Sequence, residues 1–247
     1  MAYSHPVTIL THKCVVKCIM VRNNRLDKLA SFFSSYTKIK YKKGEMILRC
    51  EDQPQGVYFL KKGYVKMNTI LPEGKDLTLN IFKPGTYFPM MWAIAHSKNA
   101  YSFQAMDATI VYRAPRDDVI TFLLANNVEL YDLTRRILIA LEGYLFNMEF
   151  LLTGNSLHRV TSAFCVLARR CNSEEQTLHV KITIPLTHQD IANLAGIARE
   201  TASIAIKELE HKKLVICTRR FFTIPDLPRL EREVFVYKHQ RRSSGVV

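Results

Sequence analysis

Two short helical patterns joined at a glycine, between residues 185 and 209, constrain the fold of this chain more than any other stretch. The first pattern opens at Thr187. Asp190, three residues later, completes a variant of the capping box, in which both side chains bond orphan backbone N–H groups. The apolar residues of this pattern share one face, and Gly196 supplies the turn into the second pattern. The stretch therefore predicts a helix-turn-helix.

The second helical pattern has two different faces at about 100° per residue. One side suits close packing against another helix, because its residues are small or apolar. They are Ala202, Ala205, Ile206 and Leu209. The other side suits base edges in the DNA major groove. The expected base-contacting residues are Arg199, Glu200, Ser203 and Ile204, with Lys207 beside them. The alternative is a pair of helices from an ordinary bundle with a solvated, charged face.

A β-hairpin is expected directly after the helix-turn-helix. Residues 214–217 and 221–224 are rich in β-branched and aromatic side chains, and residues 218–220 separate them. Arg219 and Arg220 then lie at the tip of a wing, where cations suit a phosphate backbone. The turn contains neither glycine nor asparagine, so its type is not predictable.

Composition indicates a globular protein with an anionic partner. The chain has 247 residues, is 48% hydrophobic and carries a net charge of +13. Such an excess of cations favours a polyanion, although charge alone does not separate nucleic acid from an acidic membrane surface. The sequence shows neither a spanning apolar run nor a cleavable leader, so a cytoplasmic protein without a membrane partner is expected.

The six cysteines show no disulfide-type spacing, which favours reduced thiols. They are Cys14, Cys18, Cys50, Cys165, Cys171 and Cys217. The alternative is a metal or iron–sulfur site begun by His12, Cys14 and Cys18. Cys50 would then have to complete it from elsewhere in the chain.

Between residues 37 and 112 the apolar period changes to two, after a short helical pattern at 25–36. The expected strands are residues 37–41, 45–48, 56–60, 64–68, 76–81, 100–104 and 108–112. Turn signals such as Lys43-Gly44 and Lys62-Gly63 separate them. Short strands at this spacing predict a β-barrel or jelly-roll-like β-roll. Because helical patterns follow, the expected fold class is α+β.

A helix is expected at 117–126, and a long helix at 128–153 that is apolar nearly all round. Such a helix must be buried on several sides, so the roll and a symmetry-related copy of the helix are its expected neighbours. The expected dimer interface is Leu133, Ile137, Ala140, Leu141, Tyr144, Met148 and Leu151. The alternative is the central helix of a monomer.

The expected organisation has five parts. They are an N-terminal arm (1–24), a β-roll sensor domain (25–127), a dimerisation helix (128–153), a winged helix-turn-helix domain (154–229) and a basic C-terminal tail (230–247).

This order of parts resembles the Crp/Fnr superfamily of bacterial transcription regulators, from about residue 37 to residue 225. The motifs that carry the resemblance are Lys42-Lys43-Gly44-Glu45, residues 57–65, residues 82–88, Leu186-Thr187-His188-Gln189-Asp190-Ile191-Ala192 and Ala198-Arg199-Glu200-Thr201. The resemblance implies that Arg199 reads guanine O6/N7 and Glu200 reads cytosine N4. The expected phosphate contacts are Thr187, Gln189, Thr201, Lys207, Arg219 and Arg220. Ile204 departs from the family, many of whose members carry arginine there.

The expected sensor site departs further from the family. Cyclic-AMP-binding members carry a Gly-Glu pair and an Arg-Ser pair where this chain has Pro89-Met90 and Asn99-Ala100. No carboxylate is then available for the ribose and no arginine for the phosphate, so cyclic AMP is not expected. A candidate effector pocket is apolar: Phe88, Met90, Met91, Trp92, Asn99, Tyr101 and Tyr144, with Phe103 and Met148. The alternatives are a filled core or haem held through His96.

The expected function is sequence-specific transcription regulation by a homodimer on a palindromic operator. The implied partners are double-stranded DNA, a second copy of the chain and RNA polymerase. An enzyme of cupin type is disfavoured, because His96 is the single histidine between residues 37 and 112 and a histidine metal site cannot be built. The remaining alternative is a nonspecific architectural DNA binder.

Overall fold

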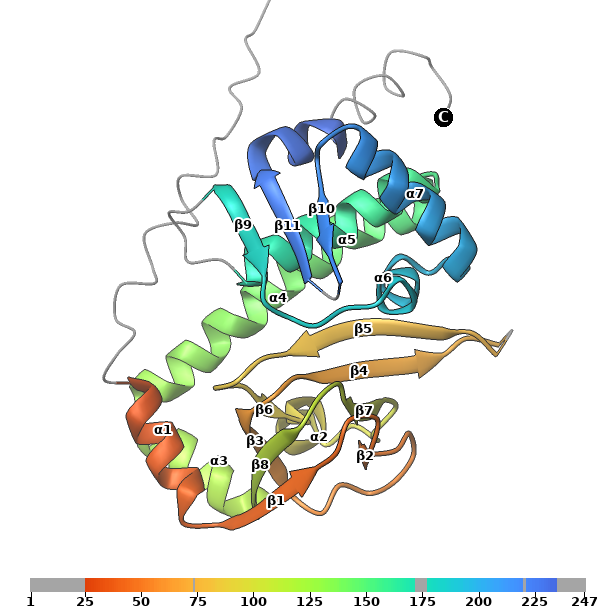
Figure 1. Cartoon of the computed structure of the whole chain (residues 1–247). Helices are drawn as coiled ribbons and strands as arrows, with labels where there is room; N and C mark the ends of the chain where they lie inside the picture. The colour runs from red at the N-terminus through yellow and green to blue at the C-terminus, as the bar shows by residue number, and fades with distance from the viewer. Residues whose placement is uncertain (1–24, 73, 172–176, 220, 235–247) are drawn as a thin grey trace, which may run out of the picture.

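The computed structural model describes residues 25–72, 74–171, 177–219 and 221–234. The fold has an N-terminal β-roll and a C-terminal unit of helices and a small sheet, joined by the long helix α4 (Asn127–Thr153) (Figure 1). The predicted α+β class is therefore confirmed. The expected N-terminal arm, with Cys14 and Cys18, lies outside the described residues.

The β-roll is made of two antiparallel four-stranded sheets. The first has the order β1 (Thr37–Tyr41), β8 (Thr109–Ala114), β3 (Val57–Lys62), β6 (Tyr87–Phe88). The second has the order β2 (Met46–Leu48), β7 (Ser102–Ala105), β4 (Val65–Ile70), β5 (Asp76–Phe82). Three helices accompany them: α1 (Arg25–Ser34), α2 (Met90–Ala95) and α3 (Arg116–Ala125).

Strand β3 shows why the roll needs helices as well as a second sheet. Val57 and Phe59 are buried in a cluster with residues of α1, α3 and α4. Tyr58 and Leu60 are buried in a second cluster, with residues of the opposite sheet. Because successive side chains of a strand point to opposite faces, β3 is apolar on both sides. The first sheet is consequently sandwiched between the second sheet and the helices.

The C-terminal unit packs three helices against a three-stranded sheet. Its helices are α5 (Ser156–Cys171), α6 (His188–Ala195) and α7 (Arg199–His211). Its sheet has the order β10 (Ile216–Thr218), β11 (Phe221–Asp226), β9 (Leu178–Ile182). Residues 227–234 are also helical. Leu230 and Val234 are fully buried in this unit's core, so residues 230–234 belong to this unit and not to the expected tail.

The two units contact one another through β5 and α6 (Figure 1). Ile81 of β5 and Met106 belong to the buried core of the C-terminal unit. Polar contacts add to this junction, since Lys66 Nζ lies 3.9 Å from Asp190 Oδ1 and Tyr64 Oη lies 3.2 Å from Thr183 Oγ1. The helix-turn-helix is thereby held against the roll.

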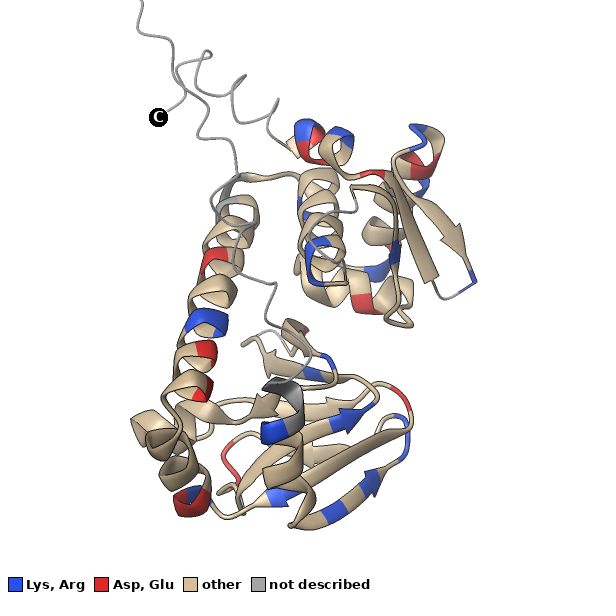
Figure 2. Ribbon diagram, turned by 90° about the vertical axis from the view of Figure 1, so that its left-hand side faces the viewer, with Lys and Arg blue, Asp and Glu red and all other residues tan. Residues whose placement is uncertain are grey.

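Helix α4 stands along one side of both units (Figure 2). It buries Leu133 in the roll and Phe150 in the C-terminal core. The opposite side of the helix is exposed and apolar, with Leu138 and Leu145 exposed by 59% and 57%. In the described ranges, neither α4 nor another helix is both long enough and apolar enough to cross a membrane.

Two turn glycines of the roll, Gly63 and Gly44, allow a matched test of packing, because both have a positive φ, +88° and +85°. A Cβ on Gly63 would lie 2.6 Å from the side chains of Asp107 and Thr109, whereas one on Gly44 would meet nothing within 4 Å. Both alanine variants incur left-handed strain of about 1–2 kcal/mol, and Gly63→Ala adds about 1–3 kcal/mol of overpacking. Urea unfolding should therefore show the larger loss for Gly63→Ala. Equal losses would contradict this account.

Candidate DNA-binding site

The first helix of the helix-turn-helix begins at the predicted capping box. Thr187 Oγ1 accepts a hydrogen bond from the backbone N–H of Asp190 at 3.2 Å, and Asp190 Oδ2 accepts one from the backbone N–H of Thr187 at 2.8 Å. The helix ends at Gly196 in the left-handed conformation, φ +62°. These local contacts fix both ends of α6 and the turn that leads into α7.

Helix α7 presents the two faces that its sequence predicts. Ala202, Ala205, Ile206 and Leu209 are buried in the core of the C-terminal unit. Small side chains on this face let α7 lie close to α5 and α6. Arg199 and Glu200 are exposed in its first turn, and Ile204 is 69% exposed. The expected base-contacting face is thus accessible from solvent.

Ser203, the fourth expected base-contacting residue, is engaged inside the protein. Its Oγ lies 2.9 Å from Nδ1 of His188, the first residue of α6. The imidazole in turn lies 6.3 Å from the ring of Phe222, centroid to centroid. His188 was not among the expected site residues, and this contact gives it a role in orienting Ser203. In the sequence, the position of His188 beside the cap of α6 was the feature that could have indicated this role.

The expected phosphate-contacting residues are spread over α6, α7 and the wing. Thr187 and Gln189 are exposed at the start of α6, and the Gln189 amide donates to Asn193 Oδ1 at 2.8 Å. On α7, Thr201 is half-buried and Lys207 is exposed. All four thus lie on the helix-turn-helix or at its first cap.

The hairpin β10–β11 forms a wing with a basic tip (Figure 2). Arg219 is exposed at this tip with φ +51°, whereas Arg220 lies outside the described residues. An unexpected cation stands nearby: Lys181 of β9 is exposed, and its Nζ lies 5.4 Å from the centroid of the Phe221 ring. The alternating pattern of β9 was the signal that could have identified Lys181 as outward-facing.

The apolar face expected on α4 is only partly the one that is exposed. Leu133 is 6% exposed in the roll core, the Tyr144 ring lies 6.0 Å from the Arg170 guanidinium, and Leu151 lies near Gly196. Leu133 is therefore buried in its own chain, which corrects its place in the expected dimer interface, whereas Tyr144 and Leu151 are half-buried. Ile137, Leu141 and Met148 are exposed, and Ala140 is half-buried.

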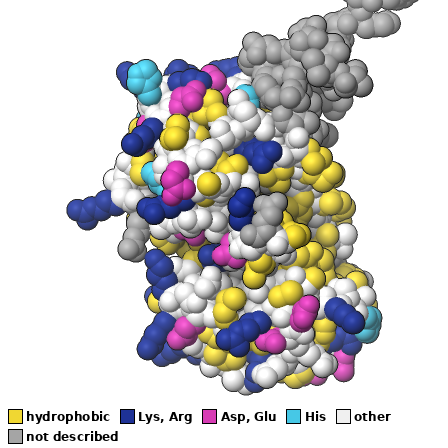
Figure 3. Space-filling model, turned by 90° about the vertical axis from the view of Figure 1, so that its right-hand side faces the viewer, with side chains coloured by type: hydrophobic (Ala, Val, Ile, Leu, Met, Phe, Trp, Pro, Cys, Tyr) yellow, Lys and Arg dark blue, Asp and Glu magenta, His cyan; other side chains and the backbone are white. Residues whose placement is uncertain are grey.

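The exposed face of α4 follows a heptad pattern that we term the α4 seam. It consists of Tyr131, Thr134, Leu138, Leu141, Leu145, Met148 and Leu152. Apolar residues that alternate at spacings of three and four are typical of two-stranded helix packing. Hydrophobic side chains gather along the right-hand edge of the molecule in Figure 3, the side on which α4 runs. In the sequence, the α4 seam could have been identified from the seven-residue spacing of Tyr131, Leu138, Leu145 and Leu152.

The residues expected to line an effector pocket belong to different clusters of the roll. Phe88 is 1% exposed, and its ring stacks on that of Phe103 with centroids 4.8 Å apart. Met90 and Trp92 pack in the other cluster of the roll, and Met91 is 51% exposed. The remaining expected residues are Asn99, Tyr101, Tyr144 and Met148. The stacked aromatic rings are the packing that the filled-core alternative expects between the sheets.

The two positions that depart from the cyclic-AMP pattern have structural partners. Met90 packs against the cluster that includes residues of α1 and α3. Asn99 is 6% exposed, and its Nδ2 donates to the backbone carbonyl of Arg49 at 2.6 Å. These side chains place neither a carboxylate nor a guanidinium at those positions.

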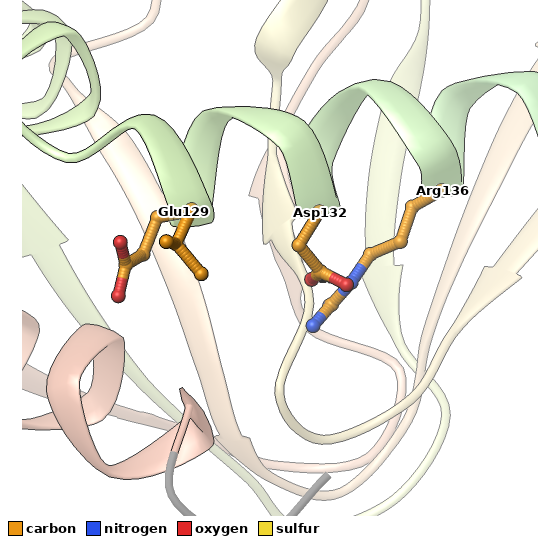
Figure 4. Close-up of a pocket in the computed structure, with 4 residues that line it drawn as sticks. Glu129, Asp132 and Arg136 are labelled. Atoms are coloured by element: carbon orange, nitrogen blue, oxygen red, sulfur yellow. Dashed lines mark ion pairs between the residues drawn. The ribbon is translucent and has the colours of Figure 1, made fainter. Parts of the chain in front are cut away.

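A small pocket on α4, lined by Val128, Glu129, Asp132 and Arg136, lies beside the roll (Figure 4). Asp132 Oδ2 accepts from Arg136 Nε at 2.6 Å, and Arg136 Nη1 donates to the carbonyl of Gly85 at 2.9 Å. Burial raises the pKa of the neighbouring Tyr87 phenol above its ordinary value. The charged groups of this pocket thus hold the Gly85 turn to α4.

Of the candidate metal and haem ligands, Cys50 and His96 lie within the described residues, whereas His12, Cys14 and Cys18 do not. Cys50 is exposed, and the described residues contain no group of three or more His, Cys, Asp or Glu side chains arranged around a metal position. His96 is exposed, and its Nε2 lies 2.8 Å from Arg116 Nη2. Burial raises the pKa of the Cys165 thiol, which disfavours its thiolate.

Comparison with known proteins supports the two-part organisation. A cyclic nucleotide-binding domain model matches residues 38–126, and a Crp-like helix-turn-helix domain model matches residues 158–233. The transcriptional regulator LdrP of Thermus thermophilus is 25% identical over 197 residues, which is 78% of this chain and 95% of LdrP. A CRP-like cAMP-activated global transcriptional regulator of Mycobacterium tuberculosis is 22% identical over 205 residues, 83% of this chain and 91% of that protein.

Solved structures share the fold. A CooA mutant from Carboxydothermus hydrogenoformans has a TM-score of 0.69 at 17% identity, covering 86% of this chain and 96% of that one. A CRP/FNR-family transcriptional regulator from Thermus thermophilus has a TM-score of 0.60 at 22% identity, covering 80% of this chain and 98% of that one. Since both domain models match in this order, the chain belongs to the Crp/Fnr family of DNA-binding transcription regulators.

Proposed function

We propose that this regulator recognises a specific DNA sequence through the first two turns of α7. The observation that carries this proposal is the exposure of Arg199 and Glu200 on a helix whose opposite face is completely buried. Arginine pairs bidentately with guanine O6 and N7, and a carboxylate accepts from cytosine N4. Thr187, Gln189, Thr201, Lys207, Arg219 and Arg220 would contact the phosphate backbone and set the register of α7.

The regulator acts as a homodimer on a palindromic operator. The α4 seam supports this, because an exposed apolar stripe seven residues in period is suited to pairing with a second copy of itself. Two α7 helices related by a two-fold axis would enter successive major grooves, so the half-sites would be symmetric and about one helical turn apart.

The β-roll responds to a signal other than cyclic AMP or has lost a ligand altogether. The stacked rings of Phe88 and Phe103 and the buried amide of Asn99 support this part of the proposal. As a transcription regulator, the protein would work in the cytoplasm with RNA polymerase as a partner and without enzymatic activity. The relatives, which are named as transcriptional regulators, support the role in transcription from which these assignments follow.

Replacing Arg199 and Arg219 should separate base recognition from phosphate binding. Arg199→Ala should weaken binding to the selected operator by roughly 10- to 100-fold and leave binding to random DNA nearly unchanged, because a bidentate base contact is lost. Arg219→Ala should weaken both and reduce the salt dependence by about one ion per chain. Competition binding after selection from random-sequence DNA, repeated at several salt concentrations, measures both effects.

The selection also distinguishes the alternatives for the whole protein. Recovery of a symmetric site with a clear preference over random DNA is the expected result. Strong salt dependence without a preferred sequence would instead identify a nonspecific architectural binder and overturn the proposal.

A charge in the α4 seam should prevent dimer formation. Leu145→Glu buries a carboxylate against its symmetry mate, whereas Ile139→Glu makes the same chemical change outside the seam, at a side chain that is 42% exposed. Sedimentation equilibrium should show a monomer for Leu145→Glu and a dimer for Ile139→Glu and the wild type. A dimer for both variants would remove the α4 seam as the interface.

Cyclic AMP should leave the protein unaffected. A ligand that binds only the folded state at 100 times its Kd stabilises that state by about 2.7 kcal/mol. Binding would therefore be visible as a higher unfolding temperature. Because the chain lacks the carboxylate and arginine expected to hold cyclic AMP, millimolar cyclic AMP should change neither the thermal unfolding temperature nor the affinity for the selected operator. A clear rise in either quantity would show that the roll binds the nucleotide and would contradict this part of the proposal.

A further inference from the structure

Ile204 is an exposed apolar residue on α7 that does not contribute to the fold. Its side chain is 69% exposed and belongs to none of the three buried clusters or the partly buried residues packed against them. A β-branched residue is also a poorer helix former than alanine or leucine. Neither packing nor helix propensity therefore accounts for isoleucine at this position.

The neighbours of Ile204 distinguish it from an ordinary exposed hydrophobic residue, which by itself would need no explanation. Glu200 precedes it by four residues, so the two side chains lie one above the other on the helix. Arg199 precedes it by five residues and Lys207 follows it by three, and both are exposed. Ile204 is therefore the apolar member of a charged, outward-facing surface.

Ser203 does not compete with Ile204 for the same role. Its hydroxyl lies 2.9 Å from Nδ1 of His188 and is half-buried, so a hydrogen-bonding partner within the protein already engages it. Beyond the first turn of α7, Ile204 is consequently the exposed side chain best placed to meet the DNA bases.

The major groove offers a single apolar group to such a side chain. The exposed edges of guanine, cytosine and adenine carry hydrogen-bond donors and acceptors, whereas thymine adds a 5-methyl group. Ile204 lies about 6 Å along the helix axis from Glu200, since α7 rises about 1.5 Å per residue. That separation allows it to contact a base pair close to the one that Glu200 reads.

We propose that Ile204 specifies a thymine in each half-site by contacting its 5-methyl group. This assignment rests on the proposed function of α7 as the base-contacting helix. The operator should therefore contain a thymine near the base pairs read by Arg199 and Glu200.

Deoxyuridine tests the assignment, because it differs from thymidine only by the missing methyl group. The operator selected by the full-length protein is synthesised with deoxyuridine replacing one thymine of a half-site at a time. One replacement should weaken wild-type binding by about fourfold, the effect of withdrawing one methyl group from an apolar contact. Ile204→Ala should bind the thymine and uracil probes equally.

Two further variants separate a methyl contact from a general loss of affinity. Ile204→Val keeps a β-branched side chain and should retain most of the preference for thymine. Lys207→Ala removes an exposed cation from the same helix and should weaken binding to both probes by the same factor.

Failure of this inference can be distinguished from failure of the proposed function. A symmetric operator whose binding is insensitive to every deoxyuridine substitution overturns the role of Ile204 and leaves sequence-specific binding intact. A thymine preference that persists in Ile204→Ala has the same consequence. Selection of no preferred sequence overturns both proposals.

Discussion

Burial of one side of α4 is the constraint on which the arrangement of the whole molecule depends. Leu133 is buried with the roll and Phe150 with the C-terminal unit, so one helix fixes the positions of both. Burying a large apolar side chain contributes about 1.5–3 kcal/mol. The partly exposed pair of Lys66 and Asp190, with 3.9 Å between charged atoms, contributes about 0–1 kcal/mol. Apolar packing, rather than the ion pair, therefore determines how the helix-turn-helix sits on the roll.

The helical period separates residues that hold α7 in place from residues that are available to DNA. Ala202, Ala205 and Ile206 are buried, and substitutions there would disturb the packing of α7. Arg199 and Ile204 are exposed, so they can differ between relatives without a cost to the core. The capping interaction of α6 contributes about 1 kcal/mol and involves residues outside the exposed face of α7. Operator preference can therefore change while the fold remains the same.

The sequence predicted those elements whose pattern is local. The helix-turn-helix has a capping box and a glycine turn, and glycine-rich turns separate most strands of the roll. It did not predict β6 and α2, since residues 87–95 are short and nearly uniformly apolar and show no period. It misplaced Leu133 because a helix that is apolar on most sides offers several stripes, and tertiary packing decides which is buried. It likewise could not tell whether Phe88 lines a cavity or stacks on Phe103, since both require aromatic residues.

Stacked aromatic rings occupy part of the space between the two sheets of the roll. Ligand pockets typically occupy about 300 Å³ or more, and an empty apolar cavity of that size would cost about 7 kcal/mol at 24 cal/mol per Å³. Stacking of Phe88 on Phe103, with Phe82 beside them, places apolar side chains between the two sheets instead. Asn99 is likewise satisfied by the Arg49 carbonyl. These contacts belong to the packing of the roll itself, and the C-terminal unit meets the roll at α4 and at the β5–α6 junction.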